Sequence, residues 1–180
     1  KSKYYVDFSF RRDASTRFAK DNRWGNFFSV GGNWIISDEE FLKSINQISL
    51  IKIRSSYGEL GNNQGIGFFP YLEGYSTGWS NGNNSGVLQG GVVDSNIKWE
   101  KTSLFNIAMD YGFFNNRING TIEYYSKKSI DLLFNKPLPP SLGDPYIYTN
   151  VGTVQNTGLE FIVNTINIHN RDLYWTSSFN

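Results

Sequence analysis

The chain has 180 residues and a formal net charge of +1, so no strong field points to nucleic acid as a partner. It contains no cysteine, which excludes a disulfide framework and a thiolate metal site. Aromatic residues make up 17% of the chain, and no window offers the roughly 18 apolar residues of a spanning helix. A soluble β-protein and a membrane β-barrel both stay open, because barrel strands produce no such window.

The first half of the chain carries three runs of residues that alternate between apolar and polar. They lie at 4–11, 27–36 and 50–58, and a period of two predicts strands with one apolar face. Between the second and third runs, Ser37 and Glu40 have the spacing of a capping box, so we expect a short helix there.

The segment from Gly61 to about Glu100 differs in character from the runs before it. It is rich in Gly, Asn, Ser and aromatic residues, as in GYSTGWSNGNNSG, and it shows little regular alternation. We therefore expect a long loop at 61–100, and loops of this length are usually functional or disordered.

The stretch IAMDYGFFNNRINGTIEYYS, residues 107–126, predicts a β-hairpin, because two alternating runs flank a tight Asn115-Asn116 turn. The second run continues until Pro137 and the two prolines after it, which should end the strand. Two more runs follow, at 157–168 and from Leu173 onward.

The connections between these runs alternate in length: those after the first, third and fifth runs are long, and the others are shorter. Long extracellular loops and short periplasmic turns give this asymmetry in outer-membrane barrels. We therefore predict an all-β fold, an antiparallel up-and-down transmembrane β-barrel of which this chain forms about seven strands. The alternative is a soluble carbohydrate-binding β-sandwich module, in which the apolar faces would pack on each other.

Candidates for catalysis and metal binding are scarce in this sequence. His169 is the single histidine and falls in a predicted turn, so neither a Ser/His/Asp triad nor a histidine metal cluster can be built. No pair of carboxylates stands out for glycoside hydrolysis. We predict a protein that is not an enzyme, with no catalytic residues, cofactor or metal.

Four blocks of the sequence have a distinctive composition and order. In chain order they are FRRDASTRFAKDNRWGNFFSVGGNWIISDEEFL, IKIRSSYGELGN, IKWEKTSLFNIAMDYGFFNNRINGTIEYYSKKSIDLLFNKPLP and NVGTVQNTGLEF. Together they resemble the SusC/RagA family of TonB-dependent outer-membrane transporters of Bacteroidetes-type bacteria. Both ends of the chain fall inside alternating runs, so we expect an internal piece of a longer protein.

The resemblance implies a location in the bacterial outer membrane and a barrel of about 22 strands closed by an N-terminal plug. It also implies import of glycan oligomers or peptides with a SusD-like surface lipoprotein, powered through TonB. Residues 1–180 would then all belong to the barrel domain and form about a third of its wall. The plug domain and the TonB box would lie outside this chain.

Within this picture the sequence nominates three groups of residues. Inward-facing residues would line a polar lumen: Asp7, Arg54, Asp110 and Glu123. Outward-facing residues would contact lipid: Phe105, Ile107, Met109 and Phe113. Aromatic faces stack on sugar rings while amides bind hydroxyls, so the long loop supplies the candidates for substrate contact: Tyr71, Tyr75, Trp79 and Asn81.

Overall fold

The computed structural model describes residues 2–180, and the side chain of Asn81 lies outside the described part. This range forms a seven-stranded antiparallel sheet and a separate two-stranded hairpin. The sheet contains β1 (Tyr4–Ala14), β2 (Trp24–Ile35), β3 (Ile48–Asn62), β6 (Glu100–Phe113), β7 (Ile118–Pro137), β8 (Tyr146–His169) and β9 (Tyr174–Phe179). The hairpin contains β4 (Tyr75–Asn81) and β5 (Asn84–Gln89); the short helices are η1 (Ile36–Asp38), α1 (Glu40–Lys43) and η2 (Pro140–Leu142).

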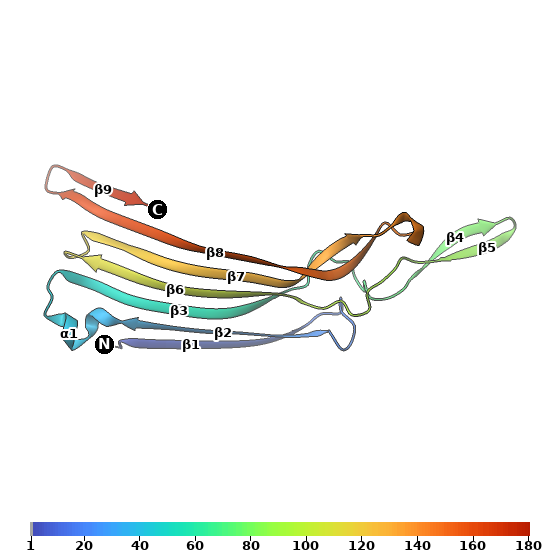
Figure 1. Ribbon diagram of the computed structural model, residues 1–180, viewed down its shortest axis with the longest axis horizontal. Helices are drawn as coiled ribbons and strands as arrows, with labels where there is room; N and C mark the ends of the chain where they lie inside the picture. The colour runs from blue at the N-terminus through green and yellow to red at the C-terminus, as the bar shows by residue number, and fades with distance from the viewer. Residues whose placement is uncertain (1) are drawn as a thin grey trace.

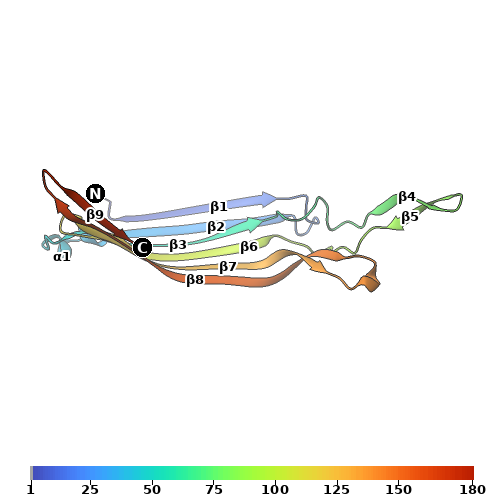
Figure 2. The same ribbon diagram turned by 90° about the horizontal axis from the view of Figure 1, so that it is seen from above.

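The strands of the sheet follow one another in the order β1-β2-β3-β6-β7-β8-β9, each antiparallel to its neighbours (Figure 1). Seen from above, the sheet is a single curved layer with β1 and β9 at its edges (Figure 2). The predicted all-β, up-and-down fold and its seven strands are therefore confirmed as an open part of a barrel. None of the helices in the described part has the length and apolar character needed to cross a membrane.

One strand is much longer than the sequence predicts. The strand predicted at 157–168 is β8, which begins at Tyr146 and has 24 residues, while β7 has 20. β7 and β8 project well past the other strands at one end of the sheet (Figure 1). Both strands are longer than the roughly 9–11 residues that a barrel strand needs to cross a bilayer. The predicted end of β7 at the prolines is confirmed, since the strand stops at Pro137.

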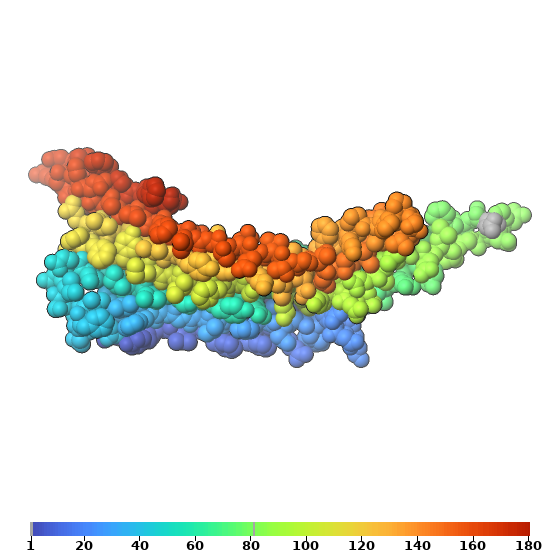
Figure 3. Space-filling view, in the orientation of Figure 1, coloured from blue at the N-terminus to red at the C-terminus, as the bar shows by residue number. Residues whose placement is uncertain are grey.

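Three expectations about the connections were wrong. Residues 61–100 are not a loop without regular structure, because β4 and β5 form a hairpin within them that projects from one end of the molecule (Figure 3). The expected short helix is present as α1, but Ser37 does not cap it: the residue before α1 is Glu39, and its side chain makes no cap bond either. Long and short connections do not alternate strictly, since 36–47 is longer than 15–23.

The predicted turn at Asn115-Asn116 is confirmed. It joins β6 to β7, and the strands pair up to Phe113 and Ile118 on either side of it. Phe114, Asn115 and Asn116 have φ values of 53°, 56° and 62°. Asparagine tolerates this left-handed region better than most residues, which explains why two of them occupy the turn.

Candidate functional site

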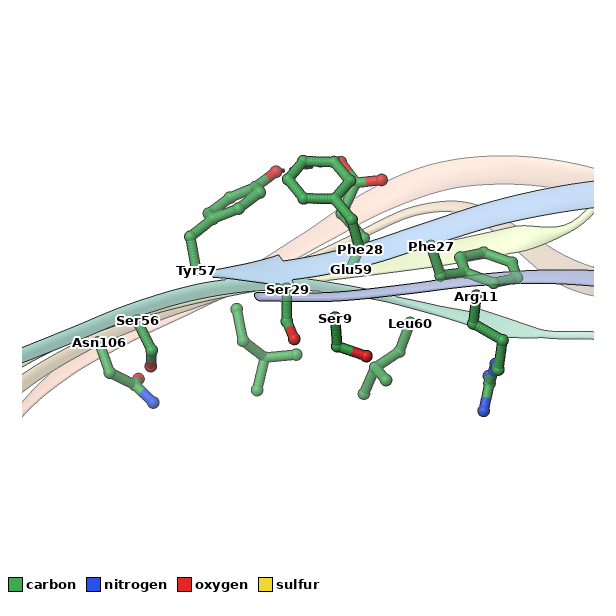
Figure 4. Close-up of a pocket in the computed structure, with 12 residues that line it drawn as sticks. Ser9, Arg11, Phe27, Phe28, Ser29, Ser56, Tyr57, Glu59, Leu60 and Asn106 are labelled. Carbon is green, nitrogen blue, oxygen red and sulfur yellow. Dashed lines mark hydrogen bonds between the residues drawn. The ribbon is translucent and has the colours of Figure 1, made fainter. Parts of the chain in front are cut away.

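The sheet has one polar and one apolar face, and the strand register fixes which residues share each of them. Figure 4 shows the division around β2 and β3: Phe28 and Tyr57 point to one side, while Ser29 and Ser56 point to the other. The two serines share their side with Asn106 of β6. The period of two read from the sequence therefore assigns side chains to faces correctly.

The apolar face carries large exposed side chains along its length, including Val6 (81% exposed) and Phe8 (69%). Near the α1 end, Tyr4 stacks on Trp34 with ring centroids 6.1 Å apart. Farther along the sheet, Phe28 packs on Tyr57 at 5.7 Å. Residues 28 and 34 of β2 lie about 20 Å apart along the strand. The separation of these two aromatic pairs is close to the height of the apolar band in outer-membrane barrels, about 25 Å, whose two borders are rich in aromatic residues.

The four lipid-facing candidates lie on this apolar face. Phe105, Ile107 and Met109 are exposed there. Phe113 is two strand periods beyond Met109 and shares the face, and its ring lies 5.8 Å from that of Tyr111.

On the polar face the structure brings three of the four lumen-facing candidates together. Arg54 donates from Nη2 to Glu123 at 2.7 Å and from Nε to Asp110 at 3.4 Å. Lys52 lies 3.5 Å from Asp110, and Thr121 donates to Asp110 at 2.9 Å. These groups come from β3, β6 and β7, so the network joins three adjacent strands. Each charge in it has a partner of opposite sign, which lowers the cost of placing charges on a partly covered surface.

Asp7, the fourth candidate, lies on the same face but outside this network. Its carboxylate rests on Gly31 of β2, where an added Cβ would be 2.6 Å from Asp7 Oδ1. Asp7 lines a shallow hollow together with Lys52, Arg54 and Asn106.

The long connections form a small core of their own, which the sequence does not reveal. Its buried residues, drawn from β2 and from connections 15–23, 63–74 and 90–99, are Phe18, Phe27, Ile66, Ile97 and Trp99. Trp99 packs on both Phe18 and Phe27, with ring centroids 5.2 and 5.5 Å apart. We call this group, with the side chains that pack against it, the loop cluster.

Polar side chains fasten the loop cluster to the extensions of β7 and β8. Asn150 accepts a bond from the Lys98 amide and donates to the carbonyls of Lys98 and Asp131. Asp94 accepts from the Thr149 hydroxyl at 2.5 Å. Asp144 accepts from the Val92 amide at 2.7 Å. These bonds replace water around backbone groups that the irregular connection cannot pair by itself.

The four substrate-contact candidates separate in space. Tyr71 is partly buried and packs against the loop cluster. Tyr75 and Trp79 are exposed on β4, where the Trp79 indole donates to the Ser76 hydroxyl at 3.0 Å. The Asn81 side chain lies outside the described part. Tyr75 and Trp79 therefore share the projecting hairpin, whereas Tyr71 belongs to a packed region.

Glu39 closes the opposite end of the sheet, in the connection after β2. Its carboxylate accepts bonds from Lys3 at 2.8 Å, from the Tyr4 hydroxyl at 2.6 Å and from the Trp34 indole at 3.2 Å. The Lys3 bond, followed by those of Tyr4 and Trp34, lowers the pKa of Glu39 to about 2. Hydrogen bonds to the charged form explain this direction. The contact attaches the 36–47 connection to the start of β1.

Within the described residues, no group of three or more His, Asp or Glu side chains has a geometry that could hold a metal ion.

Comparison with known proteins places the chain among outer-membrane receptors. The family described as "TonB dependent receptor-like, beta-barrel" matches residues 2–180. Two similar proteins are TonB-dependent receptor P39 of Formosa agariphila, 37% identical over 100% of this chain, and TonB-dependent receptor SusC of Bacteroides thetaiotaomicron, 36% identical over 99%. The chain spans 17% and 18% of their lengths.

Solved structures agree with this placement. The RagAB peptide importer in its closed-closed state matches with a TM-score of 0.87 and 31% identity, over 98% of this chain and 19% of that one. Its open-open state matches with a TM-score of 0.85. The resemblance to SusC/RagA proteins is confirmed, and the chain belongs to the TonB-dependent receptor-like β-barrel family of the outer membrane.

Proposed function

We propose that this segment forms part of the wall of an outer-membrane active transporter that imports glycan oligomers or peptides. A SusD-like surface lipoprotein would cooperate with it, and TonB would supply the energy. The observation that carries the proposal is the division of one curved sheet into a banded apolar face and a polar face with an ion-pair network. In a membrane every strand must pair its backbone inside the protein, so such a sheet fits only a closed barrel.

In this arrangement the apolar face contacts lipid and the polar face lines the interior. Lys52, Arg54, Asp110 and Glu123 would lie against a wet lumen or the plug. The loop cluster and the β4–β5 hairpin lie at the end with the long connections, which is the extracellular end in barrels of this kind. Tyr75 and Trp79 would therefore meet a substrate or the surface lipoprotein before any residue of the wall does.

The near-equal match to the closed-closed and open-open forms of the relative supports a wall that keeps its shape. A soluble carbohydrate-binding sandwich is not favoured, because it needs two sheets packed face to face. The described residues form one open sheet and one hairpin. The family is one of receptors and transporters, and we propose no catalytic role for this segment.

The test compares two samples of cells. One sample lacks the full-length protein that carries this segment, and the other is the same cells after the protein is restored. Fluorescent neutral oligosaccharides and fluorescent oligopeptides of matched size are supplied with and without an uncoupler of the inner-membrane proton gradient. We expect restored uptake of one of the two classes, and its loss with the uncoupler. Uptake that is unchanged by restoring the protein, or that is insensitive to the uncoupler, would contradict the proposal.

A further inference from the structure

Two tyrosines cover glycines on opposite faces of the sheet. On the apolar face, Tyr111 lies over its register partner Gly120, and its hydroxyl donates to the Ile162 carbonyl at 3.2 Å. On the polar face, Tyr125 lies over its register partner Gly158. A Cβ added at Gly158 would lie 2.7–2.8 Å from Cε1, Cζ and the hydroxyl oxygen of Tyr125.

This close approach determines how the Tyr125 ring is presented. The outer half of the ring can rest on β8 only because position 158 has no side chain. A ring that rests on a strand lies along the wall instead of standing away from it. One flat aromatic face is therefore turned toward the space in front of the polar face.

Polar groups surround this ring. Asn106 of β6 is the register partner of Tyr125, and Asn156 and Glu160 lie two residues on either side of Gly158 on β8, on the same face. These residues line one shallow hollow together with Leu104, Glu123, Ser126 and Lys127. The hollow contains amides that donate and accept, the exposed carboxylate of Glu160, which accepts only, and the exposed ammonium of Lys127, which donates only.

The ion-pair network described above reaches this hollow through Glu123, which lines it together with Tyr125. Arg54 pairs with Glu123, which is the register partner of Glu160. Arg54 therefore compensates the charge of Glu123, and the carboxylate of Glu160 stays at the exposed rim. The region around Tyr125 thus combines an aromatic face with hydroxyl-binding groups at its edge.

We propose that Tyr125, Asn106, Asn156 and Glu160 form a sugar-binding subsite on the inner wall. This inference rests on the proposed function, because it takes the polar face as the interior of a transporter. The C–H face of a neutral hexose ring would stack on Tyr125. Its hydroxyls would donate to Glu160 and exchange hydrogen bonds with the two amides, a combination of apolar surface and few polar groups that is typical of ligand sites.

The experiment measures binding to the full-length protein in detergent by calorimetry. The probes are hexasaccharides of α-glucan, β-glucan and mannan, and a mixture of uncharged hexapeptides. We expect Tyr125→Ala to weaken binding of the preferred hexasaccharide by about tenfold, the usual size of one aromatic stacking contact. Tyr125→Phe keeps the ring and should stay within about twofold of the unaltered protein.

Two further variants separate the subsite from a general structural effect. Gly158→Ala leaves the ring chemically intact but pushes it off the wall, so it should weaken sugar binding as Tyr125→Ala does. Tyr111→Phe removes the hydroxyl of the other tyrosine–glycine pair on the apolar face and should leave sugar binding unchanged. A heat-sensitive shift in gel mobility checks that every variant contains a folded barrel.

Several outcomes would overturn the subsite. They are unchanged sugar affinity in Tyr125→Ala and Gly158→Ala, binding of peptides alone, and no hexasaccharide bound by the unaltered protein. A lower melting temperature with unchanged affinity would instead assign Tyr125 to a contact inside the barrel. Uptake that is sensitive to the uncoupler is measured in parallel, and it distinguishes failure of the subsite from failure of the proposed transport function. Uptake that survives in Tyr125→Ala with unchanged affinity rejects the subsite alone, whereas absence of uptake by the unaltered protein rejects the proposed function.

Discussion

The wall and the loop cluster of this molecule follow different physical rules. Five of the six buried hydrophobic residues in the described part belong to the loop cluster, where Phe18 and Ile97 have no exposed surface. The wall instead exposes a whole face of Val, Phe, Ile and aromatic side chains. The cluster is therefore built like the core of a soluble domain, whereas the apolar face of the wall is left for its surroundings to cover, which we propose are lipid and neighbouring strands.

The largest predicted effect on stability comes from opening a cavity in the loop cluster, and it tests whether the cluster and the wall are separate. Phe18→Ala removes a fully buried ring, and such changes cost about 3–5 kcal/mol. We expect hydrogen exchange in the full-length protein to accelerate in connections 15–23 and 90–99, while the amides of β6 and β7 keep their protection.

The matched control is Phe68→Ala, since this ring is 77% exposed and makes a cation–π contact with Arg17. It should cost no more than about 1 kcal/mol. Equal acceleration throughout the wall and the cluster in Phe18→Ala would show that the two regions unfold together.

A charge placed on the wall should have a somewhat smaller effect that depends on the face. Ile107→Lys puts an ammonium on the apolar face, which on the proposed contact with lipid costs about 2–4 kcal/mol near the bilayer midplane. Asn106→Lys puts the same group on the polar face and should be tolerated. Folding of the full-length protein into lipid vesicles in urea, followed by gel mobility, measures both. Equal losses in the two variants would contradict the assignment of faces.

The smallest predicted effect concerns the end of the sheet that Glu39 closes. Its pKa falls from the ordinary 4.5 to about 2 in the folded protein. A carboxylate with a lowered pKa stabilises the fold above its unfolded value and loses that contribution as the pH falls through the folded value. We expect the environment of Trp34, read by fluorescence, to change between pH 4.5 and about 2.

Glu39→Gln should remove this pH dependence, because the amide does not titrate in that range. Glu40→Gln is the matched control. The carboxylate of Glu40 is next in the chain to that of Glu39, but it pairs with Lys43 on α1, whereas the Trp34 indole bonds to Glu39. A pH response of Trp34 that persists in Glu39→Gln would show that another group causes it.

Much of the wall could be predicted from the sequence because its signal is local. Alternation places Arg54, Asp110 and Glu123 on one face regardless of what surrounds them. Their ion pairs could not be predicted, since they depend on a register between residues that are 56 and 69 positions apart. The same holds for Glu39, which meets Lys3 across 36 positions.

The loop cluster could not be predicted because its residues have no period. Phe18, Ile66 and Ile97 stand singly in polar or glycine-rich connections, where an isolated apolar residue normally carries no structural signal. The extension of β8 before residue 157 was missed for a related reason. Its Thr, Asn and Gly residues pair with β7 through the backbone, and backbone pairing leaves no hydrophobic pattern.

The β4–β5 hairpin lies between β3 and β6, yet β3 and β6 pair directly with each other. Its own hydrogen bonds are made within the hairpin, and its turn at 82–83 points away from the sheet. Residues can therefore be inserted or deleted at that turn without shifting the register of any wall strand. The pairing of the wall therefore sets no limit on the length of this appendage, and in the proposed orientation a tag inserted at the turn would be displayed at the cell surface.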